Sequence, residues 1–304
     1  MDLIGKKWFY FIFSALLIIP GIISLMTWGI KPGIEFTGGT LLEVQSSKFN
    51  PPAGGQSSRE EILNIVKSQN IDLSSIQKSG DDILLLKLKP IDKDQNQKLQ
   101  EELKKQFGDV KELRYENVGP TVGAETTQKA IKATAIATLV IVLYIAWAFR
   151  QIPKPYSSIK FGISVAVALL HDIIVVVGLF SLLGHFANVE IDSLFLTALL
   201  TVMGFSVHDT IVVFDRIREN LVKMAGNSFA QVVNESILQT LVRSLSTSLT
   251  VLFTLSALLI FGGESIRWFI VALLIGITSG TYSSIFNAAP FLVVWEEWSH
   301  KSKV

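Results

Sequence analysis

Six long apolar stretches divide this chain. Each approaches or exceeds the roughly 20 residues that a helix needs to cross a hydrocarbon core about 30 Å thick. They are residues 9–28, 133–149, 161–183, 194–214, 245–261 and 268–295. The pattern predicts an α-helical polytopic membrane protein with six transmembrane helices.

A polar region separates the first apolar stretch from the second. Its pattern predicts the order strand, helix, strand, strand, helix, strand, over residues 40–45, 58–69, 74–78, 83–88, 92–107 and 110–117. This order is typical of a small α+β domain of the ferredoxin-like kind. Its charged residues have the spacing of solvated helix faces, so no catalytic site is expected there.

Lysine and arginine in the short loops predict the orientation, because they concentrate on the cytoplasmic side of a membrane. They precede the first stretch, lie in the second-to-third and fourth-to-fifth connections, and follow the sixth. Both termini are therefore expected to be cytoplasmic. The predicted parts are a first transmembrane helix (1–29), an extracytoplasmic α+β domain (30–130), transmembrane helices 2–6 (131–298) and a cytoplasmic tail (299–304).

Composition agrees with a protein of the lipid bilayer and narrows the possible chemistry. Only 17% of the 304 residues are charged, against about 25% in ordinary soluble domains. A net charge of +1 gives no basic excess for nucleic acid. The chain has no cysteine, which excludes disulfides and thiolate metal sites. No cofactor or metal is expected.

An aspartate interrupts the fourth apolar stretch. Asp209 lies about five residues, or about 7 Å, from the middle of that stretch. An ionised aspartate at the centre of a membrane helix costs about 3 kcal/mol. Asp209 is therefore expected to be neutral, or to meet a cation or water, and is a candidate for taking up and releasing protons.

A possible cation lies at the mouth of the fifth stretch. Gln239, Arg243, Thr247, Thr250 and Thr254 follow one another at intervals of three or four residues, which places them on one helical stripe. Arg243 is expected to pair with Asp209 when that aspartate is ionised. The alternative is that Arg243 reaches lipid phosphates while Asp209 bonds to Ser206 or to a neighbouring helix.

The third stretch carries a second buried acid. His171 and Asp172 precede apolar β-branched residues, as His208 and Asp209 do in the fourth stretch. Asp172, His171, His208 and Thr247 are thus possible relay residues for protons. Neighbours on a helix point about 100° apart, so the histidine and aspartate of one pair are not expected to share a face.

Small residues form one face of the last stretch. They are Gly276, Ser279, Gly280, Ser283 and Ser284, and they include a Gly-x-x-x-Gly step. Close helix packing at Gly276 and Gly280 explains this face without any site.

Three other functions were weighed. Two intramembrane aspartates are compatible with an intramembrane aspartyl protease, but the Tyr-Asp and Gly-x-Gly-Asp patterns of presenilin-like proteases are absent. No Gly-x-x-x-x-Gly-Lys-Ser/Thr phosphate loop supports ATP-driven transport by this chain. A purely structural scaffold remains open, although it leaves Asp209 and Arg243 unexplained.

Five motifs carry a resemblance to a known family. They are GIEFTGGT at residues 33–40, which contains Gly38 and Gly39, VGPTVG at 118–123, HDTIVVFDRIREN at 208–220, RSLSTS at 243–248 and GTYSSI at 280–285. Together they resemble the SecF family of bacterial protein-export membrane proteins, relatives of the resistance-nodulation-division (RND) transporters. His208 replaces the usual asparagine, and Glu35 stands where aspartate is common.

The resemblance implies a function that the residues alone give only in part. It implies a six-helix RND-type bundle in the bacterial cytoplasmic (inner) membrane, without enzymatic activity. It also implies pairing with SecD, association with the SecYEG channel and YajC, and use of a proton or sodium gradient to move unfolded preproteins outward. Asp209 and Arg243 then correspond to ion-coupling residues, and Gly38 and Gly39 to a family motif.

Overall fold

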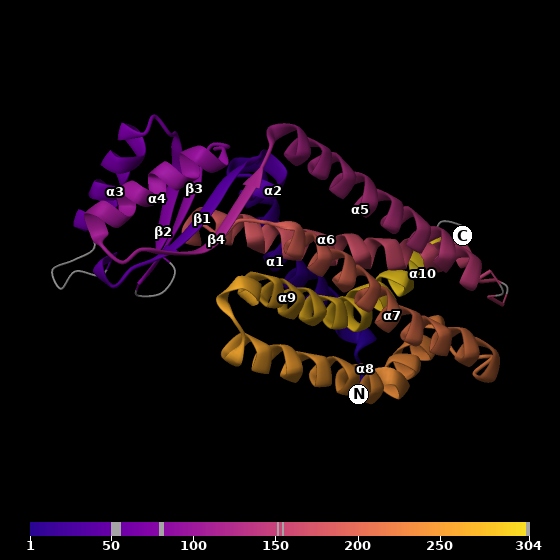
Figure 1. Cartoon of the computed structure of the whole chain (residues 1–304). Coiled ribbons are helices and arrows are strands. Elements are labelled where there is room, and N and C mark those ends of the chain that lie inside the picture. The colour runs from indigo at the N-terminus through magenta and orange to yellow at the C-terminus, as the bar shows by residue number, and fades with distance from the viewer. Residues whose placement is uncertain (50–55, 79–81, 151, 154, 302–304) are drawn as a thin grey trace. The chain divides into compact units, whose positions relative to one another are not determined.

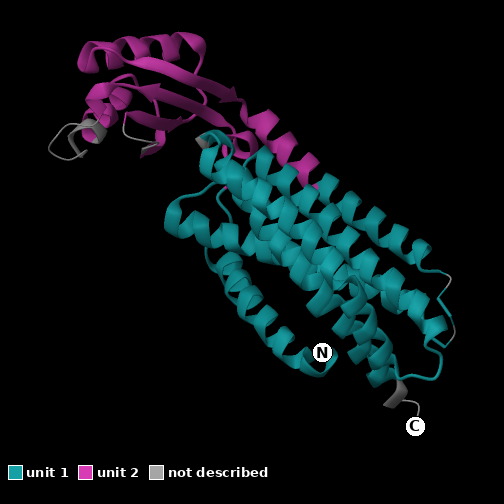
Figure 2. Cartoon of the chain, turned by 90° about the horizontal axis from the view of Figure 1, so that it is seen from below, with its two compact units in different colours: residues 1–31, 132–304 teal, residues 32–131 magenta. Residues whose placement is uncertain are grey.

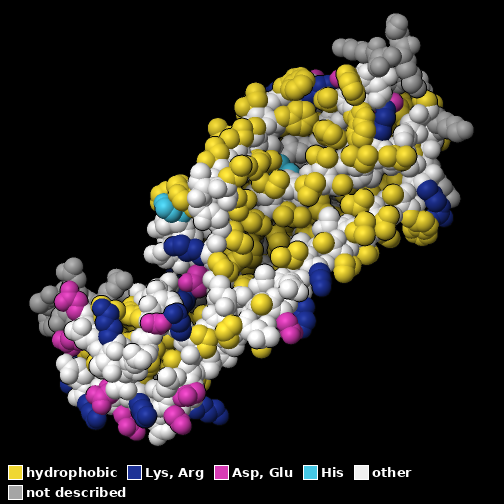
Figure 3. All heavy atoms as spheres, turned by 90° about the horizontal axis from the view of Figure 1, so that it is seen from above, with side chains coloured by type: hydrophobic (Ala, Val, Ile, Leu, Met, Phe, Trp, Pro, Cys, Tyr) yellow, Lys and Arg dark blue, Asp and Glu magenta, His cyan; other side chains and the backbone are white. Residues whose placement is uncertain are grey.

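The computed structural model describes residues 1–49, 56–78, 82–150, 152–153 and 155–301. The chain forms two compact units, which Figure 2 distinguishes by colour. One comprises Pro32–Ile131, and the other joins Met1–Lys31 to Lys132–Val304. Hydrophobic side chains cover much of the surface of the helical unit, whereas charged side chains gather on the other unit (Figure 3).

The smaller unit is an α+β domain with the predicted element order. Its elements are β1 (Gly39–Gln45), α3 (Gln56–Ser68), β2 (Leu73–Lys78), β3 (Ile83–Leu88), α4 (Lys93–Phe107) and β4 (Lys111–Val118), with a short helix α2 (Ile34–Thr37) before them (Figure 1). The strands lie in the order β2-β3-β1-β4, and every neighbouring pair is antiparallel. This is the ferredoxin-like arrangement.

Alternation along the strands builds the core of this domain. Leu42 and Val44 of β1 point to the same face as Leu84, Leu86 and Leu88 of β3, and all five are buried. Apolar residues of α3 and α4 cover that face, including Ile62, Val66, Leu99 and Leu103. Helix α4 begins at a capping box formed by Asp92 and Gln95. Burial raises the pKa of Tyr115, so its hydroxyl stays protonated and donates to the Ile91 carbonyl.

Gly38 and Gly39 form a tight junction at the start of β1. Both have a positive φ, of 77° and 141°. A Cβ atom on Gly38 would lie 2.9 Å from the Cα atom of Pro120, the first residue of α5. Thr127 of α5 donates to the Phe36 carbonyl at 3.1 Å. The turn before β1 is therefore fastened to the first turns of α5.

Within the described residues, six helical segments are long and apolar enough to cross a membrane. Five are single helices, α1 (Lys7–Thr27), α5 (Pro120–Ala148), α6 (Ser158–Ala187), α7 (Ser193–Lys223) and α8 (Phe229–Phe261). The sixth consists of α9 (Arg267–Ser283), a π-helical segment η4 (Ser284–Ala288) and α10 (Ala289–Lys301). The prediction of six spans is confirmed.

Three helices extend well beyond the predicted spans. Helix α7 runs on to Lys223, α8 begins at Phe229 and α5 begins at Pro120. Hydropathy detects only the part of a helix that is apolar all round, whereas these extensions have mixed faces. In α8 the extension buries Val232, Val233 and Ile237. The predicted boundary at residues 130 and 131 therefore falls inside α5.

Small residues set how the helices pack. A Cβ atom on Gly178 of α6 would lie 2.7 Å from the Cα atom of Gly21 of α1. Gly276 and Gly280 of α9 face Val202 and Ser206 of α7, where added Cβ atoms would approach to 2.2 and 2.9 Å. Close approach at these positions lets α6, α7 and α9 share an interior in which polar side chains meet.

Candidate functional site

Asp172 lies on α6 and is fully buried. Its Oδ2 atom accepts hydrogen bonds from Ser206 Oγ of α7 at 2.5 Å and from Ser283 Oγ of α9 at 2.7 Å. Its Oδ1 atom accepts one from Ser279 Oγ of α9 at 2.7 Å. Three hydroxyl donors offset the cost of burying this carboxyl group. They also tie α6 to α7 and α9.

Asp209 lies on α7 and is 2% exposed. Its Oδ2 atom accepts a hydrogen bond of 3.3 Å from Ser248 Oγ of α8. Ser248 also shares a hydrogen bond of 2.6 Å with Thr281 of α9. No lysine or arginine in the described part of the chain pairs with Asp209. This carboxyl group is thus held more loosely than that of Asp172, although both are buried.

Further hydroxyl groups continue the polar interior between the two acids. Thr210 Oγ1 and Ser284 Oγ are 2.8 Å apart, and Ser284 Oγ also lies within hydrogen-bond distance of the Ser206 carbonyl. Ser284 begins the π-helical segment η4. Such segments often occur at functional positions, because they rotate the residues that follow them around the helix axis.

Arg243 does not pair with Asp209 in this structure. Arg243 and Thr247 lie on the exposed face of α8, whereas Ser244 and Ser248 lie on its buried face. The expected pair with Asp209 was based on the helical spacing of residues 239 to 254, which correctly grouped those residues on one stripe. Spacing alone does not say which stripe faces inward, and packing against α7 and α9 selected the serine stripe.

His208 is exposed on α7. His171 is buried, and its Nδ1 atom lies 3.0 Å from Asp172 Oδ1. The expectation that neighbouring His171 and Asp172 do not share a face concerns the directions of their Cα–Cβ bonds, and the two side chains nevertheless touch. The angle of about 100° separates the Cα–Cβ directions, but an imidazole ring is long enough to turn back toward the adjacent side chain.

The serines and threonine that hold the two acids were not identified as site residues. They are Ser206, Ser248, Ser279, Thr281 and Ser283. Ser279 and Ser283 were attributed to helix packing alone, and this interpretation is incomplete because both donate to Asp172. Of the alternative partners of Asp209, Ser206 donates to Asp172, and the donor to Asp209 comes from a neighbouring helix, as Ser248 of α8. The sequence does contain a pattern that could have identified them: hydroxyl side chains stand one helical turn apart inside an apolar span, as Ser279 and Ser283 do.

Oxygen atoms make up most of the donor set around the two acids. Within the described residues, no group of three or more His, Cys, Asp or Glu side chains could hold a metal ion. The two carboxyl groups and the surrounding hydroxyls are hydrogen-bonding groups that exchange protons, and their oxygen atoms also suit hard cations.

Two protein-family models match this chain. A model described as "Protein export membrane protein SecD/SecF, C-terminal" matches residues 98–298, and a second, "SecD/SecF GG Motif", matches residues 23–48. The chain belongs to the SecD/SecF family. The second match includes Gly38 and Gly39, which form the junction with α5.

Two SecF relatives of this SecD/SecF protein are similar over nearly their whole length. Protein translocase subunit SecF of Thermobaculum terrenum is 47% identical, covering 97% of this chain and 94% of the relative. The SecF subunit of Anaerolinea thermophila is 41% identical, with 98% and 96% covered. In Bacillus subtilis, the protein translocase subunit SecDF is 34% identical over 97% of this chain but only 38% of its own length.

Solved structures of SecDF share the fold. The crystal structure of SecDF, a translocon-associated membrane protein from Thermus thermophilus, is 31% identical with a TM-score of 0.83. A structure of SecDF in a super-membrane-facing form is also 31% identical, with a TM-score of 0.71. They cover 98% and 100% of this chain, which spans about two fifths of either SecDF chain. This chain is a multi-pass membrane protein with an RND-like fold.

Proposed function

We propose that this chain is the SecF subunit of a protein-export complex, and that it works together with SecD. Its relatives of similar length are named SecF. In the SecDF relative of Bacillus subtilis, the matching part is only 38% of a longer chain. A separate SecD chain would supply the remainder of such an assembly.

The exposed faces of α7 and α8 are suited to bind SecD. On α7, Thr197, Thr201, Gly204 and His208 are exposed at intervals of three or four residues. On α8, Arg243, Thr247, Thr250 and Thr254 do the same. We refer to these eight residues as the outer polar stripe. A row of polar side chains within membrane-spanning helices is costly against lipid but not against another protein.

Gly204 supports this assignment of the partner surface. A Cβ atom there would meet nothing within 4 Å, so packing inside this chain does not require a glycine. Glycine on a membrane helix permits the close approach of another helix. The outer polar stripe therefore offers both a glycine, where a helix of SecD can approach closely, and polar groups that can form hydrogen bonds with SecD.

The single observation that carries the proposed mechanism is the state of Asp209. It is buried, accepts a long hydrogen bond of 3.3 Å from Ser248, has Thr281 and His208 nearby, and pairs with no lysine or arginine among the described residues. Uptake of a proton removes the cost of a buried charge, and its release restores that cost. Occupancy of Asp209 can thus change which arrangement of α7, α8 and α9 is more stable.

Arg243 takes the complementary role at the surface. An arginine stays charged at any physiological pH, and this one is exposed within a membrane-spanning helix. We infer that it meets an acidic group of SecD. It lies on the exposed face of α8, whereas Ser248 of the buried face contacts Asp209. A membrane potential of 100 mV supplies about 2.3 kcal/mol per charge, which changes a two-state ratio more than tenfold.

Catalysis does not form part of the proposal. Ser206, Ser279 and Ser283 occupy both oxygen atoms of Asp172. Asp209 has its own donor on another helix. An aspartyl protease instead needs two carboxyl groups that share one proton and one water. The relatives are named as translocase subunits.

The cellular setting follows from the same family. We infer a place in the bacterial cytoplasmic (inner) membrane, with both termini cytoplasmic and residues 30–130 extracytoplasmic. The SecYEG channel, YajC and unfolded preproteins are the expected partners. The resemblance supports these assignments, and loop charges support the orientation.

Export of a model preprotein into inverted membrane vesicles tests the proposal. The vesicles contain this chain with its SecD, and export is measured with and without a proton gradient. Asp209→Asn and Arg243→Met are expected to assemble with SecD but to lose the gradient-dependent part of export. Asp215→Asn is the matched control, because Asp215 is an exposed acid of the same helix that pairs with Arg218 at 2.6 Å.

Gradient-dependent export by Asp209→Asn at the wild-type rate would contradict the coupling role. A stimulation that follows a sodium gradient rather than a proton gradient would identify sodium as the coupling ion. Failure of Arg243→Met to assemble with SecD would instead assign Arg243 to the interface alone.

A further inference from the structure

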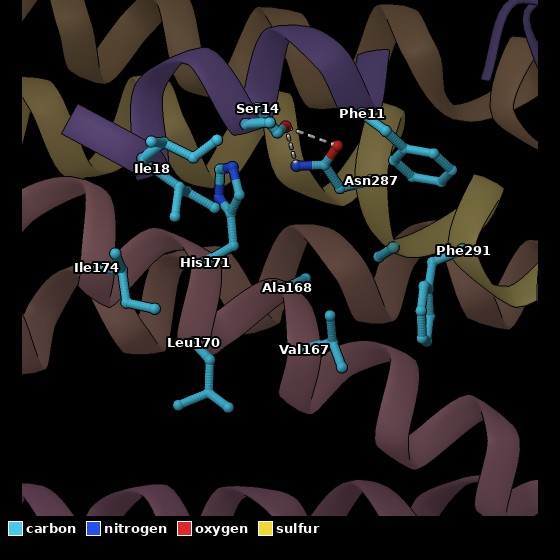
Figure 4. A pocket seen from close by; sticks show the side chains of 13 residues that line it. Phe11, Ser14, Ile18, Val167, Ala168, Leu170, His171, Ile174, Asn287 and Phe291 are labelled. Carbon is cyan, nitrogen blue, oxygen red and sulfur yellow. Dashed lines mark hydrogen bonds between the residues drawn. The ribbon is translucent and has the colours of Figure 1, made fainter. Parts of the chain in front are cut away.

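A cavity of about 440 Å³ lies between α1, α6 and the η4–α10 segment. Figure 4 shows its walls, which come from all three. Its size lies within the range of about 300–1,000 Å³ that is usual for ligand sites. We refer to this cavity as the α1–α6 groove. The residues that line it include neither the serines that donate to Asp172 and Asp209 nor any residue of the outer polar stripe.

Three alanines create the space. Ala15 of α1, Ala168 of α6 and Ala288 of η4 line the groove, so each of the three elements contributes a small side chain. Phe11 and Phe291 add aromatic walls (Figure 4). Protein interiors are normally packed without voids of this size, because an empty space forfeits dispersion contacts.

The mouth of the groove opens to the surroundings of the bundle. Ile19 and Leu170 line it and are 54% and 51% exposed. Both belong to membrane-spanning helices. Helix α1 packs against α6, whereas α8 packs against α7 and α9. The mouth therefore lies on other helices than the outer polar stripe assigned to SecD.

Water is a poor occupant of the groove. Ser14 and Asn287 line it, but their side chains are hydrogen-bonded to one another at 2.7–2.9 Å. Among the described residues that line it, the Nε2 atom of buried His171 has no hydrogen-bond partner. An ordered water needs two to four polar partners. That nitrogen is itself buried, so the groove offers water little besides apolar walls.

We propose that the α1–α6 groove binds the acyl chain of a membrane lipid. Hydrocarbon is the medium around these helices, it matches the apolar walls, and it fills the space left by the three alanines. The chain lies against the His171 ring, whose other nitrogen contacts Asp172. The His171 Nε2 atom is itself shielded from solvent, so the acyl chain meets the apolar walls of the groove rather than a free polar atom.

Photolabelling tests this proposal directly. The full chain and its SecD are placed in vesicles that contain a phospholipid with a diazirine near the middle of one acyl chain. Illumination is followed by mass spectrometry of the labelled peptides. The expected result is strong labelling of the α6 segment that contains Val167 and Leu170, together with Phe291.

Two substitutions test whether the labelling comes from a lipid inside the groove. Ala15→Phe fills the groove and should reduce this labelling several-fold. Leu16→Phe adds similar bulk to the same helix at a highly exposed position outside the groove, and should leave labelling unchanged. If Ala15→Phe impairs assembly with SecD, Ile19→Trp obstructs the mouth without entering the packed floor and should have the same effect.

Equal labelling of groove and outer-face residues in every variant would show only a general lipid annulus and would overturn the proposal. Labelling that appears without SecD and disappears with it would also overturn it, because SecD would then cover the groove. The readout is independent of export, so its failure leaves the role of Asp209 untouched.

Discussion

At the scale of residues, the two buried aspartates differ in how their charge is accommodated. Asp172 accepts hydrogen bonds of 2.5–2.7 Å from three serines, which is the environment of a carboxyl group held in one place. Asp209 accepts one of 3.3 Å. A carboxyl group with few donors changes its protonation with less rearrangement, which agrees with a coupling role for Asp209 and a positioning role for Asp172.

Two serines on the same face of α8 provide a test of this difference. Ser248 donates to Asp209, whereas Ser244, one turn earlier, is buried without a hydrogen-bond partner. Ser248→Ala should lower the free energy of unfolding by about 1 kcal/mol, because it removes the donor to Asp209. Ser244→Ala should be neutral or slightly stabilising. The free energies are measured by steric trapping in bicelles, and equal losses would contradict this account.

At the scale of elements, the junction between α2, β1 and α5 depends on glycine. Gly38 has a φ of 77° and lies against Pro120, so neither the backbone nor the space accommodates a side chain. The same residues lie inside the family's GG motif. The motif therefore has a structural reason in this chain. It holds the start of β1 against the first turn of α5.

Gly38→Ala should destabilise the α+β unit by about 2 kcal/mol or more, from the left-handed conformation and the contact with Pro120. Gly119→Ala is the matched control, since a Cβ atom there meets nothing within 4 Å and its φ is not positive. Limited proteolysis of the full chain in detergent measures the difference. Similar cleavage rates for both variants would show that the junction tolerates a side chain.

At the scale of the whole molecule, loop charges predict that both termini lie on the cytoplasmic side of the membrane. The chain has no cysteine, so a single introduced cysteine is unique. In intact cells, Lys98→Cys should react with a membrane-impermeant maleimide, whereas Asn227→Cys should react only after permeabilisation. Both positions are exposed, so access through the membrane is the variable. The reverse pattern would invert the proposed orientation.

Local patterns along the chain were enough to predict most elements of this protein. Apolar runs gave six membrane spans, and alternation with turn residues gave the order of helices and strands in the α+β unit. These features depend on short-range periodicity and on the length that a bilayer demands. The five motifs also indicated the family, because they match it at widely separated positions.

Only the tertiary structure decided which polar groups meet. Arg243 and Ser248 are five residues apart on one helix, yet the first is exposed and the second reaches Asp209. Periodicity groups residues into faces, but packing at Gly276, Gly280 and Gly178 decides which faces turn inward. The three serines around Asp172 come from two helices distant in sequence. Their convergence, and the groove beside His171, result from helix packing that no local pattern specifies.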